Sequence, residues 1–141
     1  MPHQSLFEKA KVCQVVDPDD YAAVAQNSVT VDTRGYENVA FILTFGELTT
    51  SIDMKAQQGD ASNGSDAADI SGAAITQVLA ASDNGTAILD LKRGTFTKRY
   101  VRVVVTPVGA ANYFGVVAVA YNREGAIPVT ADSTNRELKK V

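Results

Sequence analysis

The sequence predicts an all-β protein: a single-domain antiparallel β-sandwich, or a jelly-roll-like barrel, of about eight strands. Residues 39–43 are five consecutive apolar residues (VAFIL) near turn residues, a pattern typical of a central strand with both faces covered. In residues 99–106, valine recurs at positions 101, 103 and 105, which places three apolar side chains on one face of a second buried strand. Turn residues recur every ~8–15 residues, and almost no segment has helical periodicity.

Composition narrows the class of protein. At 141 residues the chain fits one domain, which buries roughly two thirds of the surface of the unfolded chain. The net charge of −3 argues against general nucleic-acid binding, which depends on clustered lysine and arginine. No apolar run approaches the ~20 residues that span a bilayer, so no membrane partner is expected, and the N-terminal residues do not have the apolar segment of a secretory signal. With one cysteine and no tryptophan, the core is expected to consist mainly of Val, Ile, Leu and Ala.

Residues 1–9 are expected to form an extended N-terminal arm outside the domain, which spans residues 10–121. The arm has no periodic pattern, yet Leu6 and Phe7 are adjacent large apolar side chains. Because so short a stretch does not fold alone, we expect these side chains to dock onto another chain. Residues 122–141 are polar with a basic end and are expected to form a C-terminal tail.

The first strand of the domain is expected at residues 10–16. The sequence Asp17-Pro18-Asp19-Asp20 should end it, because proline has no backbone N–H and aspartate favours turns. Residues 21–26 (YAAVAQ) are the best helical candidate, as a single turn. The central strand follows after residue 31.

Residues 51–57 alternate Ile52, Met54 and Ala56 with polar residues, which predicts a strand with one face on the core and one in water. Residues 59–72 are rich in Gly, Asp, Ser and Asn and should form a long surface loop. Two further strands, at residues 75–79 and 86–91, are expected around the turn at 82–85, where Asn-Gly is a strong hairpin signal.

A turn at residues 107–111 precedes a last strand at 113–121, which is apolar on both faces. An edge strand cannot expose so much apolar surface safely, so this strand is either interior or meets another subunit. We expect a closed cyclic homo-oligomer, a homotrimer rather than a homodimer. One face of the strand carries Phe114, Val116, Ala118 and Ala120, and the other Tyr113, Val117, Val119 and Tyr121.

Catalytic chemistry finds little support in the sequence. The single histidine, His3, lies in the arm, so no Ser-His-Asp or Cys-His triad is expected, and the protein is predicted not to be an enzyme. Cys13 has valine neighbours and is expected to be a small buried hydrophobe. A calcium-loop count that starts at Asp60 puts Ser65 where glycine is required and Ser71 where glutamate belongs, so no metal or other cofactor is predicted.

Basic residues gather between positions 92 and 102, with two aromatic neighbours. A phosphate-binding patch would need all of them on one surface. Charged hairpin ends, which discourage aggregation, or a protein partner with an acidic surface are favoured instead. The basic residues are Lys92, Arg93, Lys98, Arg99 and Arg102, and the aromatic residues are Phe96 and Tyr100.

Three stretches together resemble a family of small tailed-bacteriophage head proteins. They are VDTRGYENVAFILTFG at 31–46, the Gly/Asp/Ser loop GDASNGSDAAD at 59–69, and KRYVRVVVT at 98–106. Members of that family are capsid decoration, cement or head-stabilisation proteins. The resemblance, which covers roughly residues 28–121, implies a compact β domain on the outer surface of the virion, commonly oligomeric, with terminal arms that grip the major capsid protein.

The expected function is therefore that of a decoration or cement protein, assembled in the host cytoplasm, whose partners are the major capsid protein and further copies of itself. A head–tail connector or tail subunit of the same virion is the main alternative, and a carbohydrate-binding type of β-sandwich is the other. The absence of tryptophan counts against the second alternative, which needs exposed aromatic platforms. Residues expected at protein interfaces are Leu6, Phe7, Arg93, Phe96, Arg99, Tyr113 and Tyr121.

Overall fold

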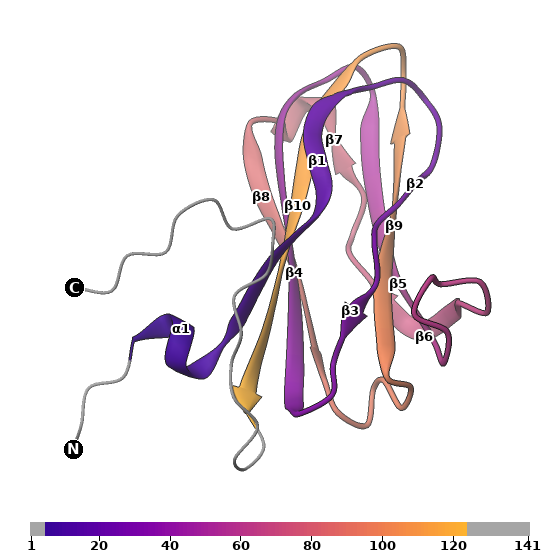
Figure 1. The fold of residues 1–141 in the computed structure, drawn as a ribbon. Helices are drawn as coiled ribbons and strands as arrows, with labels where there is room; N and C mark the ends of the chain where they lie inside the picture. Colours follow the sequence, from indigo (N-terminus) through magenta and orange to yellow (C-terminus); the bar gives the residue numbers. More distant parts are fainter. Residues whose placement is uncertain (1–4, 124–141) are drawn as a thin grey trace.

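The structure is a computed structural model that describes residues 5–123. Two antiparallel sheets face one another as a sandwich (Figure 1), which confirms the predicted fold class. Sheet A contains, in spatial order, β1 (Lys11–Tyr21), β10 (Asn112–Arg123), β4 (Tyr36–Leu48) and β8 (Gly85–Lys92). Sheet B contains β2 (Gln26–Asn27), β9 (Tyr100–Val108), β5 (Ser51–Gly59) and β6 (Ala68–Ala74), while β3 (Val31–Asp32) pairs with β9 and β7 (Val78–Leu79) with β5.

The hydrophobic core lies between the two sheets, and the period-two patterns predicted its members correctly. Phe41 in β4 and Val103 in β9 have no exposed surface, as expected for central strands. The outer side of residues 39–43 is less covered than predicted, because Ala40 and Ile42 are half-buried rather than buried. The alternating core residues are Val39, Phe41 and Leu43 of β4; Ile52, Met54 and Ala56 of β5; Val101, Val103 and Val105 of β9; and Phe114, Val116, Ala118 and Ala120 of β10.

The first strand continues through the predicted turn at residues 17–20, so that boundary is corrected. β1 pairs with β10 from Lys11 to Tyr21, with two register shifts, one before and one after Val16. Proline is tolerated here because β1 is the edge of sheet A, where an N–H can be absent without breaking a ladder bond.

The helix expected at residues 21–26 is wrong. Tyr21 closes β1, and Gln26–Asn27 form the short strand β2 against Val104 and Val105 of β9. The ring of Tyr21 packs on the ring of Phe114, with 4.5 Å between centroids. This tertiary contact holds Tyr21 in β1, and a bend at residues 23–24 leads into β2. A single helical turn is too short to compete with that contact.

The hairpin expected from residues 75–91 is also wrong. β7 pairs with β5 in sheet B, whereas β8 pairs with β4 in sheet A. The turn between them, which includes a 3₁₀ turn at Ala80–Ser82, carries the chain from one sheet to the other. Asn84 adopts the positive φ (55°) that the Asn-Gly signal indicates, and its N–H donates to the carbonyl oxygen of Gly46 at 3.0 Å.

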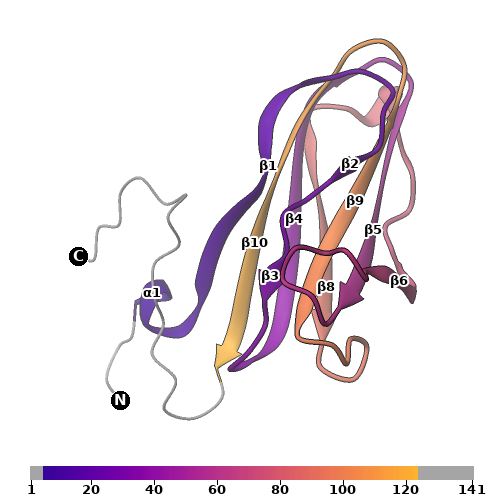
Figure 2. The same ribbon diagram turned by 45° about the vertical axis from the view of Figure 1, so that its right-hand side comes forward.

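Two predicted loops are shorter than expected. β6 begins at Ala68, inside the predicted loop at 59–72, and β9 extends through Pro107 to Val108 before the chain turns at Gly109. The loop between β5 and β6 folds back over sheet B (Figure 2), where the Thr30 hydroxyl donates to the carbonyl oxygen of Ser62.

The two ends of the described chain differ from the predicted extended arm and tail: residues 6–9 are helical, and β10 continues to Arg123. Within the expected arm, Leu6–Lys9 form one helical turn, α1, closed by the Ala10 N–H bonded to Leu6 O at 2.8 Å. Residues 1–4 and 124–141 lie outside the described residues, so most of the expected tail does too. No helix in the described range is long and apolar enough to cross a membrane.

Candidate functional site

The outer side of sheet A has an unusual composition for a surface. Side chains alternate along each strand, so the neighbours of core residues project outwards from β1, β10, β4 and β8. Register aligns them in rows: Gln14, Val117, Ile42 and Ile88 lie side by side across the four strands. We call the following outward residues of sheet A the apolar face: Val12, Ala40, Ile42, Ile88, Val117 and Val119.

The rows beside this one are also almost free of charge. Val12, Val119, Ala40 and Asp90 form one row, and Gly115, Thr44 and Thr86 form part of another. The exposed side of an antiparallel sheet ordinarily carries polar residues. Here Ile88 is 61% exposed and Val117 is 36% exposed, so the apolar face has the composition of a surface that a partner covers.

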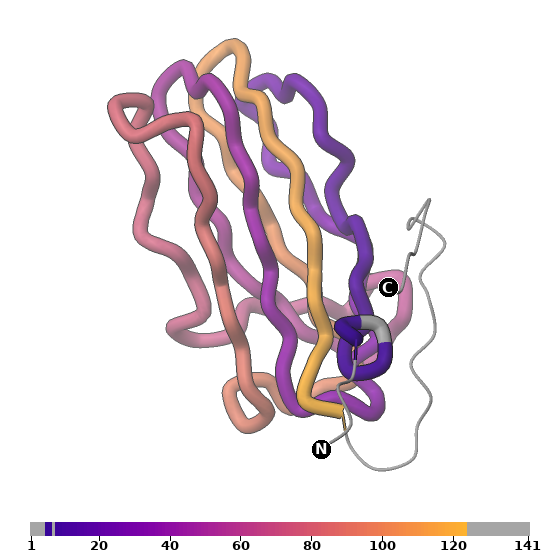
Figure 3. The backbone as a smooth tube through the Cα atoms, turned by 90° about the vertical axis from the view of Figure 1, so that its left-hand side faces the viewer, coloured from indigo at the N-terminus to yellow at the C-terminus, as the bar shows by residue number. Residues whose placement is uncertain are grey.

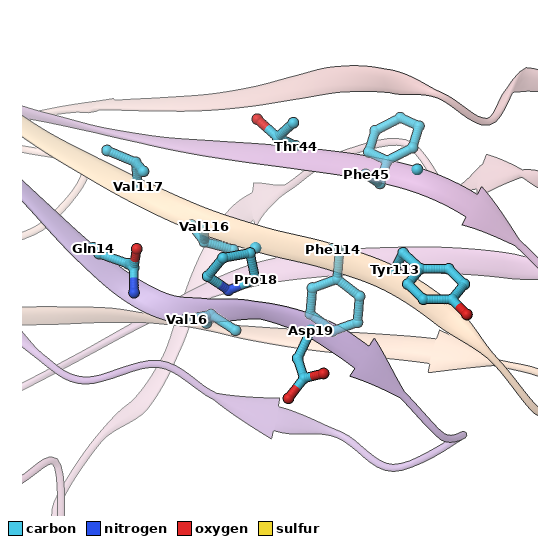
Figure 4. Close-up of a pocket in the computed structure, with 12 residues that line it drawn as sticks. Gln14, Val16, Pro18, Asp19, Thr44, Phe45, Tyr113, Phe114, Val116 and Val117 are labelled. Carbon is cyan, nitrogen blue, oxygen red and sulfur yellow. The ribbon is translucent and has the colours of Figure 1, made fainter.

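An open groove of about 520 Å³ lies at one end of the apolar face, between β1, β10 and β4. Pro18 and Gly115 both line it and lie close together, and Figure 4 shows Pro18 beside Val116 and Phe114 of β10. A Cβ on Gly115 would lie 3.0 Å from Cα and Cβ of Pro18, so any larger residue would push β1 away by a few tenths of an ångström. The groove is lined mainly by carbon atoms and by the half-exposed ring of Tyr113.

The two tyrosines expected at interfaces lie on the outer side of β10. Tyr113 borders the groove, and Tyr121 lies at the other end of the strand. The hydroxyl of Tyr121 donates to the carboxylate of Asp90 at 2.7 Å, which raises the pKa of Tyr121 because ionisation would break that bond. Tyr121 is therefore held in place against β8.

Leu6 also lies near this side of the protein. Its side chain is largely exposed and lines a second open depression of about 520 Å³ with Val119 and Tyr121. The depression adjoins the apolar face at Val119. The side chain of Phe7 lies outside what the structure describes.

Arg93 and Phe96 make their contacts within the chain. The Nη2 group of Arg93 donates to the carbonyl oxygens of Thr33 at 3.1 Å and Tyr36 at 2.6 Å, and its guanidinium lies 4.5 Å from the centre of the Phe96 ring. Phe96 has no exposed surface, so its expected place at an interface is corrected: it fills the core beneath Arg93. Local sequence does not show whether an aromatic side chain next to a basic turn is covered, as Phe96 is, or exposed.

Arg99 forms a two-pronged ion pair with Asp32. Nε and Nη2 of Arg99 donate to the two carboxylate oxygens of Asp32 at 2.9 and 2.8 Å. The hydrogen bonds from Arg99 are the main reason that the pKa of Asp32 lies below its ordinary value of 3.8. The pair joins β3 to the start of β9. Both strands belong to sheet B, whereas the apolar face lies on sheet A.

This pair predicts a pH-dependent effect for Asp32→Asn. A carboxyl group whose pKa is lowered by folding stabilises the protein above the unfolded pKa, and that stabilisation is lost as pH falls through the folded pKa. We therefore expect Asp32→Asn to lower the free energy of unfolding at pH 7, and the difference from wild type to shrink below pH 3.8. Urea unfolding at both pH values checks this. A difference that stays constant with pH would contradict the role assigned to the pair.

The carboxylates of the acidic segment at residues 60–69 form hydrogen bonds and ion pairs within the chain. Asp66 accepts the backbone N–H groups of Asp60 and Ala61 at 2.9 and 3.1 Å, and these bonds lower its pKa. Asp69 is paired with Lys55 at 2.9 Å. Within residues 5–123 no group of three His, Cys, Asp or Glu side chains is arranged to hold a metal ion. Cys13 is buried in the core.

None of the six residues of the apolar face was among the residues expected at interfaces. Ile42 was predicted to lie in a strand with both faces covered, and Ile88 in a strand with no side assigned, because local apolar content does not say which side of a strand is covered. The signal that could have found Ile88 is its alternation with Ala87 and Leu89, which are partly buried on the inner side of β8.

No protein-family model matches the chain, and no curated protein matches it in sequence. Among solved structures, the PBSX exported protein XepA is similar, with a TM-score of 0.58 and 15% identity over 99% of this chain and 46% of XepA. Two further structures are more distant. One is a Bacillus endospore appendage that forms disulfide-linked pili, with a TM-score of 0.45 and 13% identity over 83% of this chain and 92% of the appendage chain. The other is infectious bursal disease virus Gx strain, with a TM-score of 0.45 and 11% identity over 85% of this chain and 33% of the viral chain. This chain spans less than half the length of XepA, and the likeness shows a shared fold.

Proposed function

We propose that this protein is a structural subunit of a phage virion, and that it decorates the outer surface of an icosahedral head and stabilises contacts between major capsid protein subunits. The single observation that carries the proposal is the apolar face: an uncharged sheet surface, exposed at Ile88 and Val117 and half-buried at its other members, of the kind that a partner covers. The sequence resemblance to phage head proteins indicates which partner. The sandwich fold shared with XepA supports the scaffold on which the proposal rests.

The physical demands of a decoration protein fit this chain. A rigid β-sandwich keeps its docking surface in one geometry, so little conformational entropy is lost on binding. Apolar surface that is removed from water on docking stabilises the complex through the hydrophobic effect. Salt screens charge pairs but does not weaken this contribution in the same way. Many copies on one shell, linked to one another, multiply weak contacts into firm attachment.

We further propose that the protein acts without catalysis. Its only histidine is His3, outside the described residues. Several carboxylates of the described chain are engaged with backbone N–H groups, lysine or arginine, as at Asp66, Asp69 and Asp32. These are arrangements that stabilise loops and strand ends.

The test is binding of purified protein to phage heads that were assembled without it. Val117→Lys places a charge in the middle of the apolar face and is expected to reduce the amount retained on heads at least about tenfold, because a charge would be taken out of water. Val24→Lys, an equal change at an exposed site between β1 and β2, should bind like wild type. Co-sedimentation measures retention, and circular dichroism shows that both variants are folded.

Two outcomes would count against the proposal. Equal retention of Val117→Lys and wild type would exclude the apolar face as the docking surface. Electron microscopy of intact virions that places this protein at the neck or in the tail would replace the decoration role with that of a connector or tail subunit.

A further inference from the structure

The outer edge of β8 is the open margin of sheet A. β8 runs alongside β4 in an unbroken register, from Asn38 opposite Lys92 to Phe45 opposite Gly85. No described strand pairs with its other side, and Figure 3 shows β8 as the margin of the front sheet. An edge of this kind presents a row of backbone N–H and C=O groups that a further strand can pair with.

The other margins of the sandwich carry the features that ordinarily prevent such pairing. β1 contains Pro18, three aspartates and two register shifts, and the N–H of Val29 bonds to the carbonyl oxygen of Val15, which covers that side. The margins of sheet B consist of two-residue strands and of β6, whose register with β5 is interrupted. β8 has no proline and no shift, and Ile88 in its middle is 61% exposed.

We propose that β8 pairs with β8 of a second copy of this chain, antiparallel about a two-fold axis at Ile88, so that two four-stranded sheets join into one. This pairing closes as a homodimer and replaces the homotrimer expected from the sequence. This inference goes beyond the proposed function, because the dimer forms in solution without a capsid. The occupant is a second copy because the strand is complementary to itself in this register.

The complementarity can be followed residue by residue. With the axis at Ile88, each Ile88 lies opposite Ile88 of the second copy, and Thr86 lies opposite Asp90 of the second copy, where its hydroxyl can donate to the carboxylate. Lys92 lies opposite Asn84 of the second copy. Moving the axis two residues, to Asp90, would place the two Asp90 carboxylates opposite each other, and like charges in that position destabilise a pair.

The same register extends the apolar face across the axis. Val117, Ile42 and Ile88 form one row within each copy. At the axis, the row of one copy meets the same row of the other, and the exposed Ile88 gains an apolar neighbour about 4.5–5.5 Å away between Cβ atoms. The dimer would present one continuous apolar row where each monomer has a short one.

Sedimentation velocity and light scattering test the assembly. At micromolar concentration the wild-type chain should behave as a particle of twice its 14.9 kDa mass. Ile88→Lys sets two lysines opposite each other and should raise the dissociation constant at least about tenfold. Val24→Lys is the matched control, because Val24 is also 61% exposed but lies away from β8, and it should remain dimeric. An equimolar mixture of Ile88→Lys and Ile88→Glu chains should recover the dimer, which shows that each variant is folded.

Cysteine cross-links test the register. Ile88→Cys should form a disulfide-linked dimer on mild oxidation, since directly opposite residues are within disulfide range. Thr86→Cys alone and Asp90→Cys alone should not, because the like residues are about four positions apart, roughly 13 Å along the strands. A mixture of these two variants should cross-link. The native Cys13 is buried and serves as the unreactive background.

The outcomes separate this proposal from the proposed function. A wild-type monomer, a dimer that Ile88→Lys leaves intact, or cross-linking of Thr86→Cys with itself would each overturn the pairing through β8. Val117→Lys is expected to stay dimeric, because Val117 lies two strands away from β8, while it loses binding to heads. Loss of capsid binding by Val117→Lys therefore does not contradict the β8 dimer, and loss of the dimer in Ile88→Lys does not contradict the decoration role.

Discussion

Replacing Phe41 with alanine is expected to lower the free energy of unfolding by about 3–5 kcal/mol, the largest effect of any single core truncation that we predict. Phe41 has no exposed surface and lies on the inner side of β4, between Ala118 of β10 and Leu89 of β8. Both neighbouring strands hold the backbone of β4 in place, so the cavity left by the ring cannot readily close. The transfer free energy of the ring and the cost of the cavity therefore add.

Urea unfolding followed by tyrosine fluorescence or circular dichroism measures this change. The matched control is Ile42→Ala, the next residue on the same strand, whose side chain points outwards and is half-buried. It should cost clearly less than Phe41→Ala. Val103→Ala should also destabilise the fold, by about 1–3 kcal/mol, because fewer buried carbon atoms are removed. Wild-type-like unfolding of Phe41→Ala would contradict the position of β4 at the centre of sheet A.

Replacing Asn112 with alanine is expected to cost about 2–4 kcal/mol, although it removes little apolar surface. Asn112 is completely buried at the start of β10. Its side-chain oxygen accepts the N–H of Thr49 at 3.1 Å, and its amide nitrogen donates to the carbonyl oxygens of Tyr21 and Gly109, each at 3.2 Å. The side chain thus satisfies three backbone groups, at the end of β1 and in two separate turns, which alanine would leave without partners.

Asn112→Asp separates hydrogen bonding from packing, because it preserves the shape of the side chain. The carboxylate can still accept from Thr49, but it cannot donate to Tyr21 or Gly109 and would be a buried charge. We expect it to be at least as destabilising as alanine at pH 7 and less so at pH 4, where protonation is easier. Asn27→Ala, at an exposed position of β2, is the control and should be nearly neutral. Equal stability of Asn112→Ala and wild type would mean that water replaces the side chain.

Period-two patterns predicted the inner side of the sandwich well. The residues buried as expected are Val101, Val103 and Val105, then Ile52, Met54 and Ala56, and one side of residues 113–121. Burial of alternate residues is a property of one strand at a time, so a single stretch of sequence carries the whole signal.

The errors share a different cause. Residues 21–26 were expected to be helical, yet contact between Tyr21 and Phe114 keeps Tyr21 in an extended strand. Asn84 and Gly85 do form a turn, but that turn joins two sheets rather than two paired strands. In each case a residue more than thirty positions away decides the outcome, and local propensity has no access to it.

The sequence by itself determined an all-β fold, a sandwich or a jelly-roll-like barrel, with a core rich in valine and alanine, because side-chain alternation along each strand is a local property. Only the tertiary structure decided that Val12, Ile42, Ile88 and Val117 share one outer surface, since that depends on the order β1-β10-β4-β8 and on its register. Strand order is set by pairing between distant segments, and a slip of one residue would turn each of these side chains into the core. The apolar face and the open edge of β8 are thus products of long-range pairing.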